Sequence, residues 1–226
     1  MEICLMLHGL GPPPPHVAAD EAAYWLTTET FARVLDLVRQ THNHVRITFD
    51  DGNVTDARIA LPALREAGLS AAFFIPSDRI GETGYLSEGD IRELRAAGME
   101  IGSHGCAHIR WPQVPSEVVA EDVTRSIARL SSILGEKIET AAVPFGDCNL
   151  RVLRVLRTLG MRRVYTSFRG PSRDGAWLVR RDCLTAGMSQ ARIRELITKT
   201  YTAVDGAISF LRMWRHAGPA SNWPAT

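Results

Sequence analysis

Short apolar runs alternate with longer amphipathic segments along most of this chain. The apolar runs are rich in β-branched and aromatic residues, which favour buried strands. The strands predicted from them are 3–7, 45–49, 71–75, 100–102, 140–143, 163–165 and 177–180. Strands that alternate with helical segments are typical of βα units around a parallel sheet or barrel.

The amphipathic segments predict helices that cover this sheet. Apolar residues recur at helical spacing between Phe31 and Val38, and Ser87 with Asp90 forms a capping box before another such segment. Gly68 follows a third segment, at the position where helices commonly end. The predicted helices are 28–39, 55–67, 87–97, 116–134, 149–159, 189–203 and 206–215.

Length and composition are those of one soluble globular domain. The chain has 226 residues, 45% of them hydrophobic and 23% charged, so we expect a single domain over 1–226. The formal net charge of +1 argues against a nucleic-acid or membrane surface as the main partner.

Nothing in the chain predicts export or membrane insertion. The apolar N-terminal run lacks a basic region, and no later run approaches the length of a membrane-spanning helix. The four cysteines form no CxxC pair, which favours free thiols in a reducing compartment. We therefore expect a cytoplasmic protein.

Two short motifs carry metal-ligating side chains. Asp50 and Asp51 follow the predicted strand 45–49, while His104 and His108 follow the strand 100–102 at i, i+4 spacing. Alone, Asp-Gly suggests a turn and HxxxH arises by chance on a helical turn. Together and in this order, they supply an Asp/His/His ligand set with a spare carboxylate, as a hydrolytic metal site requires.

These motifs resemble those of a known family. Thr48–Gly52 and Ser103–His108 are similar to the first and second motifs of the polysaccharide deacetylases of carbohydrate esterase family 4, the NodB-homology domain. Ala142–Gly146 is similar to the third. The resemblance is strongest over residues 45–165. It implies a distorted (β/α) barrel, for which we expect about seven parallel strands.

The resemblance also implies roles for individual residues. Asp51, His104 and His108 would hold a divalent metal, most often Zn²⁺, with other divalent ions accepted in some members. Asp50 would be the general base, and the backbone N–H of Phe145 would stabilise the oxyanion.

The chain departs from the family pattern in two places. Ala142 stands where the family usually has arginine, and we expect Arg180 or Arg181 to supply a guanidinium from the strand 177–180. The late Leu-x-His motif that carries the family's general acid is missing. His8, at the end of the first strand, is our candidate for the acid, although it would equally line the substrate groove or simply cap the strand. The late histidine His216 does not follow an evident strand.

Candidates for substrate contact are weaker. Trp25 and Trp111 would either stack on a sugar ring or pack the adjacent loops, and Arg180 is a further candidate. Asp147 would contact substrate or cap the next helix, a role for which Asn149 is better placed.

Three functions remain open at this stage. The first is hydrolysis of the N-acetyl group of an N-acetylated sugar or glycan intermediate. The second is O-acetyl ester or non-sugar amide hydrolysis at the same site, because an ester leaving group depends less on an acid. The third is glycan binding without turnover, which the presence of Asp50 disfavours. A partner subunit that completes the site would fit any of them.

Overall fold

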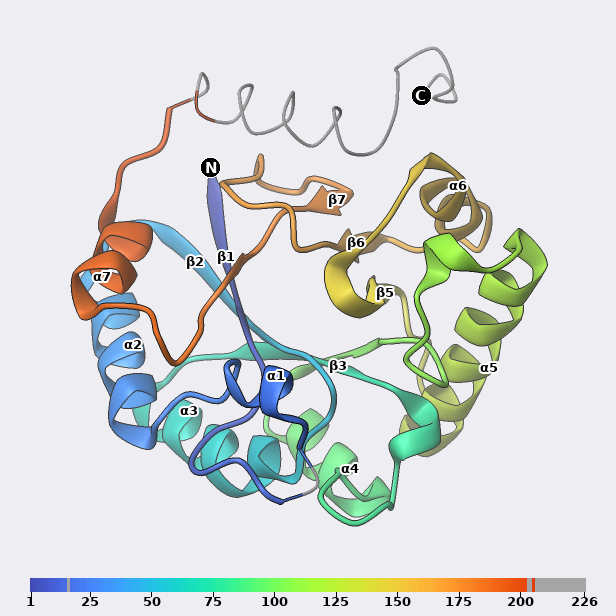
Figure 1. Ribbon diagram of the computed structural model, residues 1–226, viewed down its shortest axis with the longest axis horizontal. Coiled ribbons are helices and arrows are strands. Elements are labelled where there is room, and N and C mark those ends of the chain that lie inside the picture. Colours follow the sequence, from blue (N-terminus) through green and yellow to red (C-terminus); the bar gives the residue numbers. More distant parts are fainter. Residues whose placement is uncertain (16, 203–204, 206–226) are drawn as a thin grey trace.

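Eight strands form one sheet that curls into a distorted barrel (Figure 1). The computed structural model describes residues 1–15, 17–202 and 205. Every pairing is parallel, in the order β7-β6-β5-β4-β3-β2-β1-β8. The strands are β1 (Glu2–Leu7), β2 (His44–Phe49), β3 (Ala71–Ile75), β4 (Glu100–Ser103), β5 (Thr140–Ala142), β6 (Arg163–Tyr165), β7 (Leu178–Val179) and β8 (Asp182–Cys183). The predicted barrel is confirmed, with β8 added because Asp182 and Cys183 form no apolar run in the sequence.

Helices cover the outside of the sheet (Figure 1). They are α1 (Ala19–Ala22), α2 (Thr28–Gln40), α3 (Leu61–Ala67), α4 (Glu88–Ala96), α5 (Ser116–Leu134), α6 (Leu150–Thr158) and α7 (Gln190–Thr198). A π-helical turn, η1 (Asp56–Ala60), precedes α3, and short 3-10 turns occur at η2 (Ser77–Arg79), η3 (Trp111–Gln113) and η4 (Pro144–Gly146). The capping box of Ser87 and Asp90 is formed, and Asn149 caps α6. The predicted helix 206–215 and His216 lie outside the described residues.

Alternate residues of each strand face opposite sides of the sheet. Along β1, Leu5 and Leu7 pack with the outer helices, while Cys4 belongs to a small cluster inside the barrel. Along β3, Phe73 faces outward and Phe74 faces inward. The inner cluster consists of Cys4, Ala72, Phe74, Ala142, Tyr165 and Val179. The barrel interior is therefore filled by side chains at mid-height.

Charged residues fill the interior at the amino ends of the strands. The buried carboxylate of Glu2 accepts hydrogen bonds from Arg46 Nε at 2.8 Å and Arg163 Nη2 at 2.5 Å. Arg46 also donates to Glu100 at 3.1 Å. We call Glu2, Arg46, Glu100 and Arg163 the lower cluster. Each of its charges has an opposite partner, so it closes this end of the barrel without an unpaired ion.

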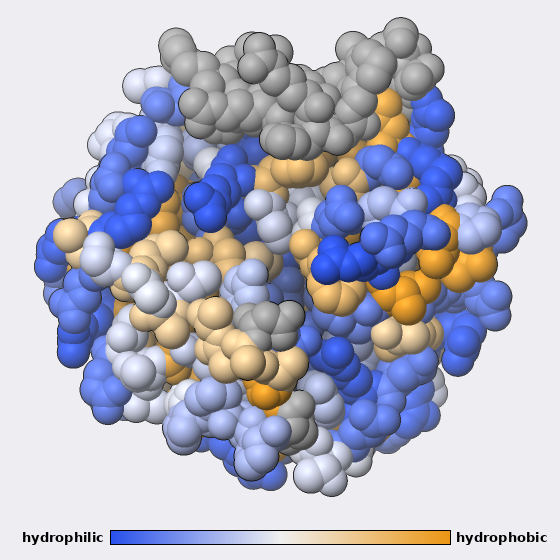
Figure 2. Space-filling model, viewed as in Figure 1, coloured by the Kyte–Doolittle hydropathy of each residue, from blue (hydrophilic) through white to orange (hydrophobic). Residues whose placement is uncertain are grey.

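The face of the molecule in Figure 2 is mixed, with hydrophilic residues over much of the periphery and hydrophobic residues in separate patches. Among the described residues, the large hydrophobic side chains that are exposed are Tyr24, Val118 and Phe145. No helix in the described part of the chain has the length and apolar character needed to cross a bilayer.

Candidate metal and catalytic site

The register of the sheet brings the two motifs together. Leu7 pairs with Phe49, and Ile75 pairs with Ser103, so β1 and β2 end together, as do β3 and β4, at the carboxyl edge of the sheet. His8, Asp50 and His104 each directly follow one of these strands. Because successive strand residues alternate sides, all three are in phase with inward-facing residues of their strands. The site therefore lies at the carboxyl end of the barrel, where βα-barrel enzymes carry their chemistry.

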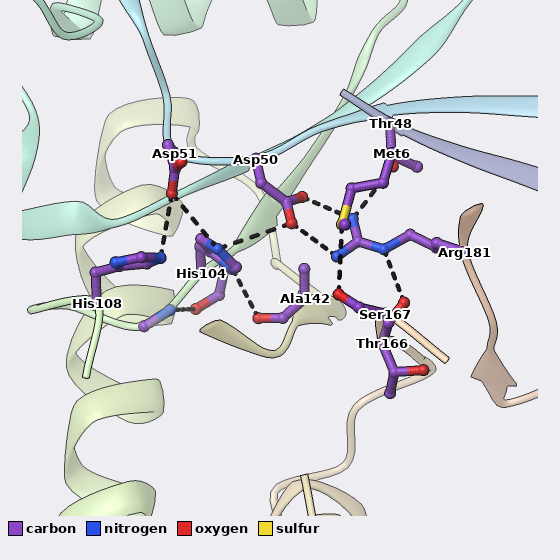
Figure 3. Close-up of polar contacts among 12 residues, drawn as sticks. Met6, Thr48, Asp50, Asp51, His104, His108, Ala142, Thr166, Ser167 and Arg181 are labelled. Atoms are coloured by element: carbon purple, nitrogen blue, oxygen red, sulfur yellow. Dashed lines mark hydrogen bonds and ion pairs between the residues drawn. The ribbon is translucent and has the colours of Figure 1, made fainter. Parts of the chain in front are cut away.

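Three side chains converge as a metal-ligand set (Figure 3). Asp51 Oδ1 lies 3.2 Å from His108 Nε2 and 3.8 Å from His104 Nε2, and one ligand atom from each residue lies within 4.8 Å of the others. Asp51 Oδ1 is buried and has no hydrogen-bond partner. A carboxylate oxygen and two imidazole nitrogens that converge in this way fit a divalent cation such as Zn²⁺.

His104 is oriented for ligation by the strand next to it. Its Nδ1 lies 2.9 Å from the carbonyl oxygen of Ala142, and its side chain is 2% exposed. A carbonyl only accepts hydrogen bonds, so Nδ1 carries the proton and Nε2 keeps its lone pair. Metal-binding histidines are commonly fixed by such an outer partner. The residue that replaces the family arginine, Ala142, thus contributes through its backbone.

His108 lies on a loop rather than on the helical turn that the HxxxH spacing predicted. Gly105 and His108 adopt positive φ values of 73° and 52°, which end any helical path. Burial, followed by the neighbouring His104, lowers the pKa of His108 to about 3. His108 is therefore a neutral imidazole at neutral pH, which is the form that binds metals.

A buried carboxylate on α5 holds this loop in place. Asp122 Oδ1 accepts hydrogen bonds from the backbone N–H groups of Cys106 and Ala107, each at 3.1 Å. Its Oδ2 accepts one from Trp111 Nε1 at 2.9 Å. Asp122 carries no signal in the sequence, because a polar residue on the buried face of a helix shows no partner there.

Asp50 is held by a bidentate arginine (Figure 3). Arg181 Nη1 and Nη2 donate to its two carboxylate oxygens at 2.6 and 2.7 Å. Arg181 also donates to Thr48 Oγ1 and to the carbonyl oxygen of Thr166, each at 3.1 Å. The guanidinium expected from Arg180 or Arg181 thus comes from Arg181. Arg180 instead donates to the carbonyl oxygen of Pro171 and is 5% exposed, and its contact with substrate stays a prediction.

The charge of Asp50 follows from this pairing. Burial alone would raise the pKa of its carboxyl group, but Arg181 and then His104 outweigh burial and lower it to about 2. Asp50 is consequently a carboxylate throughout the neutral range. Its Oδ2 lies 3.8 Å from His104 Nε2, which places it beside the ligand set without belonging to it.

His8 lies next to these groups. It directly follows β1, its Nδ1 is buried without a hydrogen-bond partner, and its ring lies 5.0 Å from that of Tyr24. The backbone N–H of Asp50 donates to the carbonyl oxygen of Leu7 at 3.0 Å, so His8 directly follows the residue that Asp50 contacts. This placement is compatible with a proton donor. The catalytic role of His8 stays a prediction.

Phe145 lies in the 3-10 turn η4 with a φ of 59°. Its ring is 47% exposed and lies 4.4 Å from that of His108, with the guanidinium of Arg110 4.0 Å from its centre. Asp51 has a φ of 77°, so all three non-glycine residues with positive φ in the described chain belong to the candidate site. The turn places the Phe145 ring beside His108, and the role of its backbone N–H as oxyanion donor stays a prediction.

Two predicted sugar-stacking residues are buried instead. Trp111 is 0% exposed and donates to Asp122, and Trp25 packs against Gly9 with 6% of its surface exposed. In this structure both indoles pack against neighbouring residues, and a role for either in sugar contact stays a prediction. Asp147 is exposed two residues after Phe145, and its contact with substrate stays a prediction.

Comparison with known proteins identifies similar sequences. A family model described as polysaccharide deacetylase matches residues 38–164. A curated protein of Bacillus subtilis strain 168, named "Putative polysaccharide deacetylase YxkH", is 26% identical over 147 residues. That match covers 64% of this chain and 53% of the relative, so the chain spans about half the length of the curated protein it matches.

Solved structures show the same fold. The deacetylase PplD of Streptococcus pyogenes, solved in complex with acetate, has a TM-score of 0.77 at 18% identity, over 87% of this chain and 98% of that chain. IcaB from Ammonifex degensii has a TM-score of 0.70 at 24% identity, over 87% and 95%. The distorted barrel is therefore shared with these proteins.

Proposed function

Because the chain belongs to the polysaccharide deacetylase family, we propose that it is a metal-dependent hydrolase that removes the N-acetyl group from an N-acetylated sugar or glycan. The observation that carries this proposal is the position of Asp50. Arg181 keeps Asp50 ionised beside the convergent donors of Asp51, His104 and His108. A ligand set with an adjacent carboxylate that is not a ligand suits hydrolysis better than binding alone.

Asp51, His104 and His108 would hold the divalent cation, for which Zn²⁺ is our candidate. When bound, such an ion acts as a Lewis acid and lowers the pKa of water to about 7 in favourable sites. Residues of this chain would carry out the proton transfers and stabilise the oxyanion.

Asp50 would accept a proton from the attacking water. Its position beside the ligand set directs the water at the acetamide carbonyl carbon, where a new C–O bond forms. The backbone N–H of Phe145 would stabilise the negative charge on the carbonyl oxygen, which is typically worth about 3 kcal/mol for one such donor.

Breakage of the C–N bond requires a proton on the leaving amine. His8 would donate it, because it follows the strand residue that Asp50 contacts and its buried Nδ1 has no hydrogen-bond partner. The products are a free amino sugar and acetate. If His8 is not the donor, Asp50 must return the proton that it took from water.

The test is acetate release from oligomers of N-acetylglucosamine, with O-acetylated xylose oligomers in parallel. We expect release by the Zn²⁺-loaded protein and none after chelation. Asp50→Asn should reduce kcat by about 10²- to 10⁴-fold, because it removes the base and leaves the three ligands unchanged. Asp36→Asn on the exposed face of α2 is the matched control and should act like the wild type.

Full activity in a folded Asp50→Asn variant would refute the proposed mechanism. Release from the O-acetylated oligomers alone would make the protein an esterase. Tight binding of Zn²⁺ without release from either substrate would favour a glycan-binding relative that has lost turnover.

A further inference from the structure

Arg79 contacts two of the three proposed metal ligands. It ends the 3-10 turn η2, and its side chain is 25% exposed. Its Nη1 lies 3.6 Å from Asp51 Oδ1, and its Nη2 is hydrogen-bonded to His108 Nδ1 at 3.4 Å. Its guanidinium also lies 5.0 Å from the centre of the Tyr85 ring. A permanent positive charge thus lies beside two of the three side chains that would hold a divalent cation.

The two histidines have opposite partners. His104 Nδ1 faces the carbonyl oxygen of Ala142, a pure acceptor, so Nδ1 carries the proton and Nε2 has the lone pair. His108 Nδ1 faces Arg79, and a guanidinium is a pure donor. In a neutral imidazole this contact leaves the lone pair on Nδ1 and the proton on Nε2. Since Nε2 points at Asp51, His104 has the tautomer that a metal requires and His108 has the other one.

From this difference we propose that Arg79 is a positioning residue that weakens binding of the divalent cation at the site, an inference that rests on the proposed metal function. Ligation by His108 Nε2 moves the ring proton to Nδ1, where it would face the Nη2–H of Arg79. Arg79 must therefore turn away from His108. Its positive charge beside Asp51 also competes with the cation for that carboxylate. The displaced guanidinium can keep a cation–π contact with the Tyr85 ring.

Charge removal at Arg79 tests the proposal through metal affinity, with no substrate present. Zn²⁺ affinity is measured at neutral pH by competition with a chromophoric chelator. We expect Arg79→Gln to bind Zn²⁺ about 10- to 100-fold more tightly, the range typical of changes to outer partners of metal ligands. The glutamine carbonyl can accept the Nδ1–H of His108, as the Ala142 carbonyl does for His104.

Two further variants separate charge from packing. Arg79→Lys keeps the positive charge and should stay close to the wild type in affinity. Arg125→Gln removes an exposed arginine that pairs with Asp78, the residue next to Arg79, and should leave the affinity unchanged. Equal or weaker Zn²⁺ binding by a folded Arg79→Gln variant would overturn the proposal.

The tautomers provide a second readout that does not depend on catalysis. Nitrogen NMR of histidine-labelled protein in the presence of chelator should show the proton on Nδ1 of His104 and on Nε2 of His108. In Arg79→Gln the His108 proton should move to Nδ1. A proton on Nδ1 of both histidines in the wild type would refute the proposal. Absence of acetate release, with these tautomers and affinities as expected, would refute only the proposed function.

Discussion

The barrel interior holds two buried clusters of carboxylates and arginines, one at each end. At the carboxyl end, Arg181 binds both oxygens of Asp50. At the amino end, the lower cluster pairs Glu2 with Arg46 and Arg163. Both clusters arise from the same two-residue period. Glu2 of β1 is in phase with His8, which follows that strand, and Arg46 of β2 is in phase with Asp50, which follows that one.

The clusters differ in what surrounds the carboxylate. The lower cluster extends from Glu2 through Arg46 to Glu100, so each charge meets only opposite charges. Beside Asp50, by contrast, two imidazoles and a second carboxylate converge, with one ligand atom of each within 4.8 Å of the others. A buried ion pair therefore does not identify a site by itself. Metal-ligating side chains of three residues that converge beside it mark the candidate site.

The largest expected effect on stability comes from breaking the pair of Asp50 and Arg181. Arg181→Met leaves Asp50 buried and without its guanidinium, which should lower the free energy of unfolding by about 3–5 kcal/mol. Urea unfolding followed by tryptophan fluorescence measures this change. Arg33→Met, at an exposed position of α2, is the control and should have little effect. A loss below about 1 kcal/mol would mean that water or another group compensates Asp50.

The pair of Asp50 and Arg181 should also make the free energy of unfolding depend on pH. The pKa of Asp50 is lowered from 3.8 to about 2 in the folded protein, so its ionisation stabilises the fold at pH values above the unfolded pKa. That stabilisation, about 2 kcal/mol, is lost as the pH falls through about 2. Unfolding measured between about pH 5 and pH 2 should show this loss in the wild type. Asp50→Asn should lack that component, and identical slopes in both proteins would contradict the assignment.

The smallest effect is expected from replacing Glu2 and Arg163 of the lower cluster together. Glu2→Met combined with Arg163→Leu removes both charges, and Arg46 keeps its contact with Glu100. Exchange of a complete buried pair for apolar residues is often neutral or stabilising. We expect unfolding free energy within about 1 kcal/mol of the wild type and unchanged acetate release. Lost activity in a folded double variant would show that the two ends are coupled.

The sequence was sufficient to predict features that depend on local periodicity. Strand runs, helix caps and the order of the motifs predicted the barrel and the grouping of Asp51, His104 and His108, because parallel strands align their carboxyl ends. It could not separate Arg180 from Arg181. Which of two adjacent residues points inward depends on the register of a two-residue strand with β1.

Tertiary contacts explain the remaining differences between the predictions and the structure. The HxxxH spacing favours a helical turn, but Asp122 on α5 binds the intervening backbone and stabilises a loop instead. The same carboxylate binds the indole of Trp111 and keeps it in the core, where the sequence left sugar contact open. Contacts between distant segments of this kind leave no periodic signal.

The positive φ values of Asp51, His108 and Phe145 limit how far the thermal stability of this protein can be raised by substitutions in the site. Each such residue costs about 1–3 kcal/mol in backbone conformation, which glycine would recover. At Asp51 and His108 that gain would sacrifice a ligand. At Phe145 the proposed contribution is a backbone amide, which glycine retains. Replacement of Phe145 by glycine is therefore a change in the site that can raise thermostability and still keep the proposed backbone contribution.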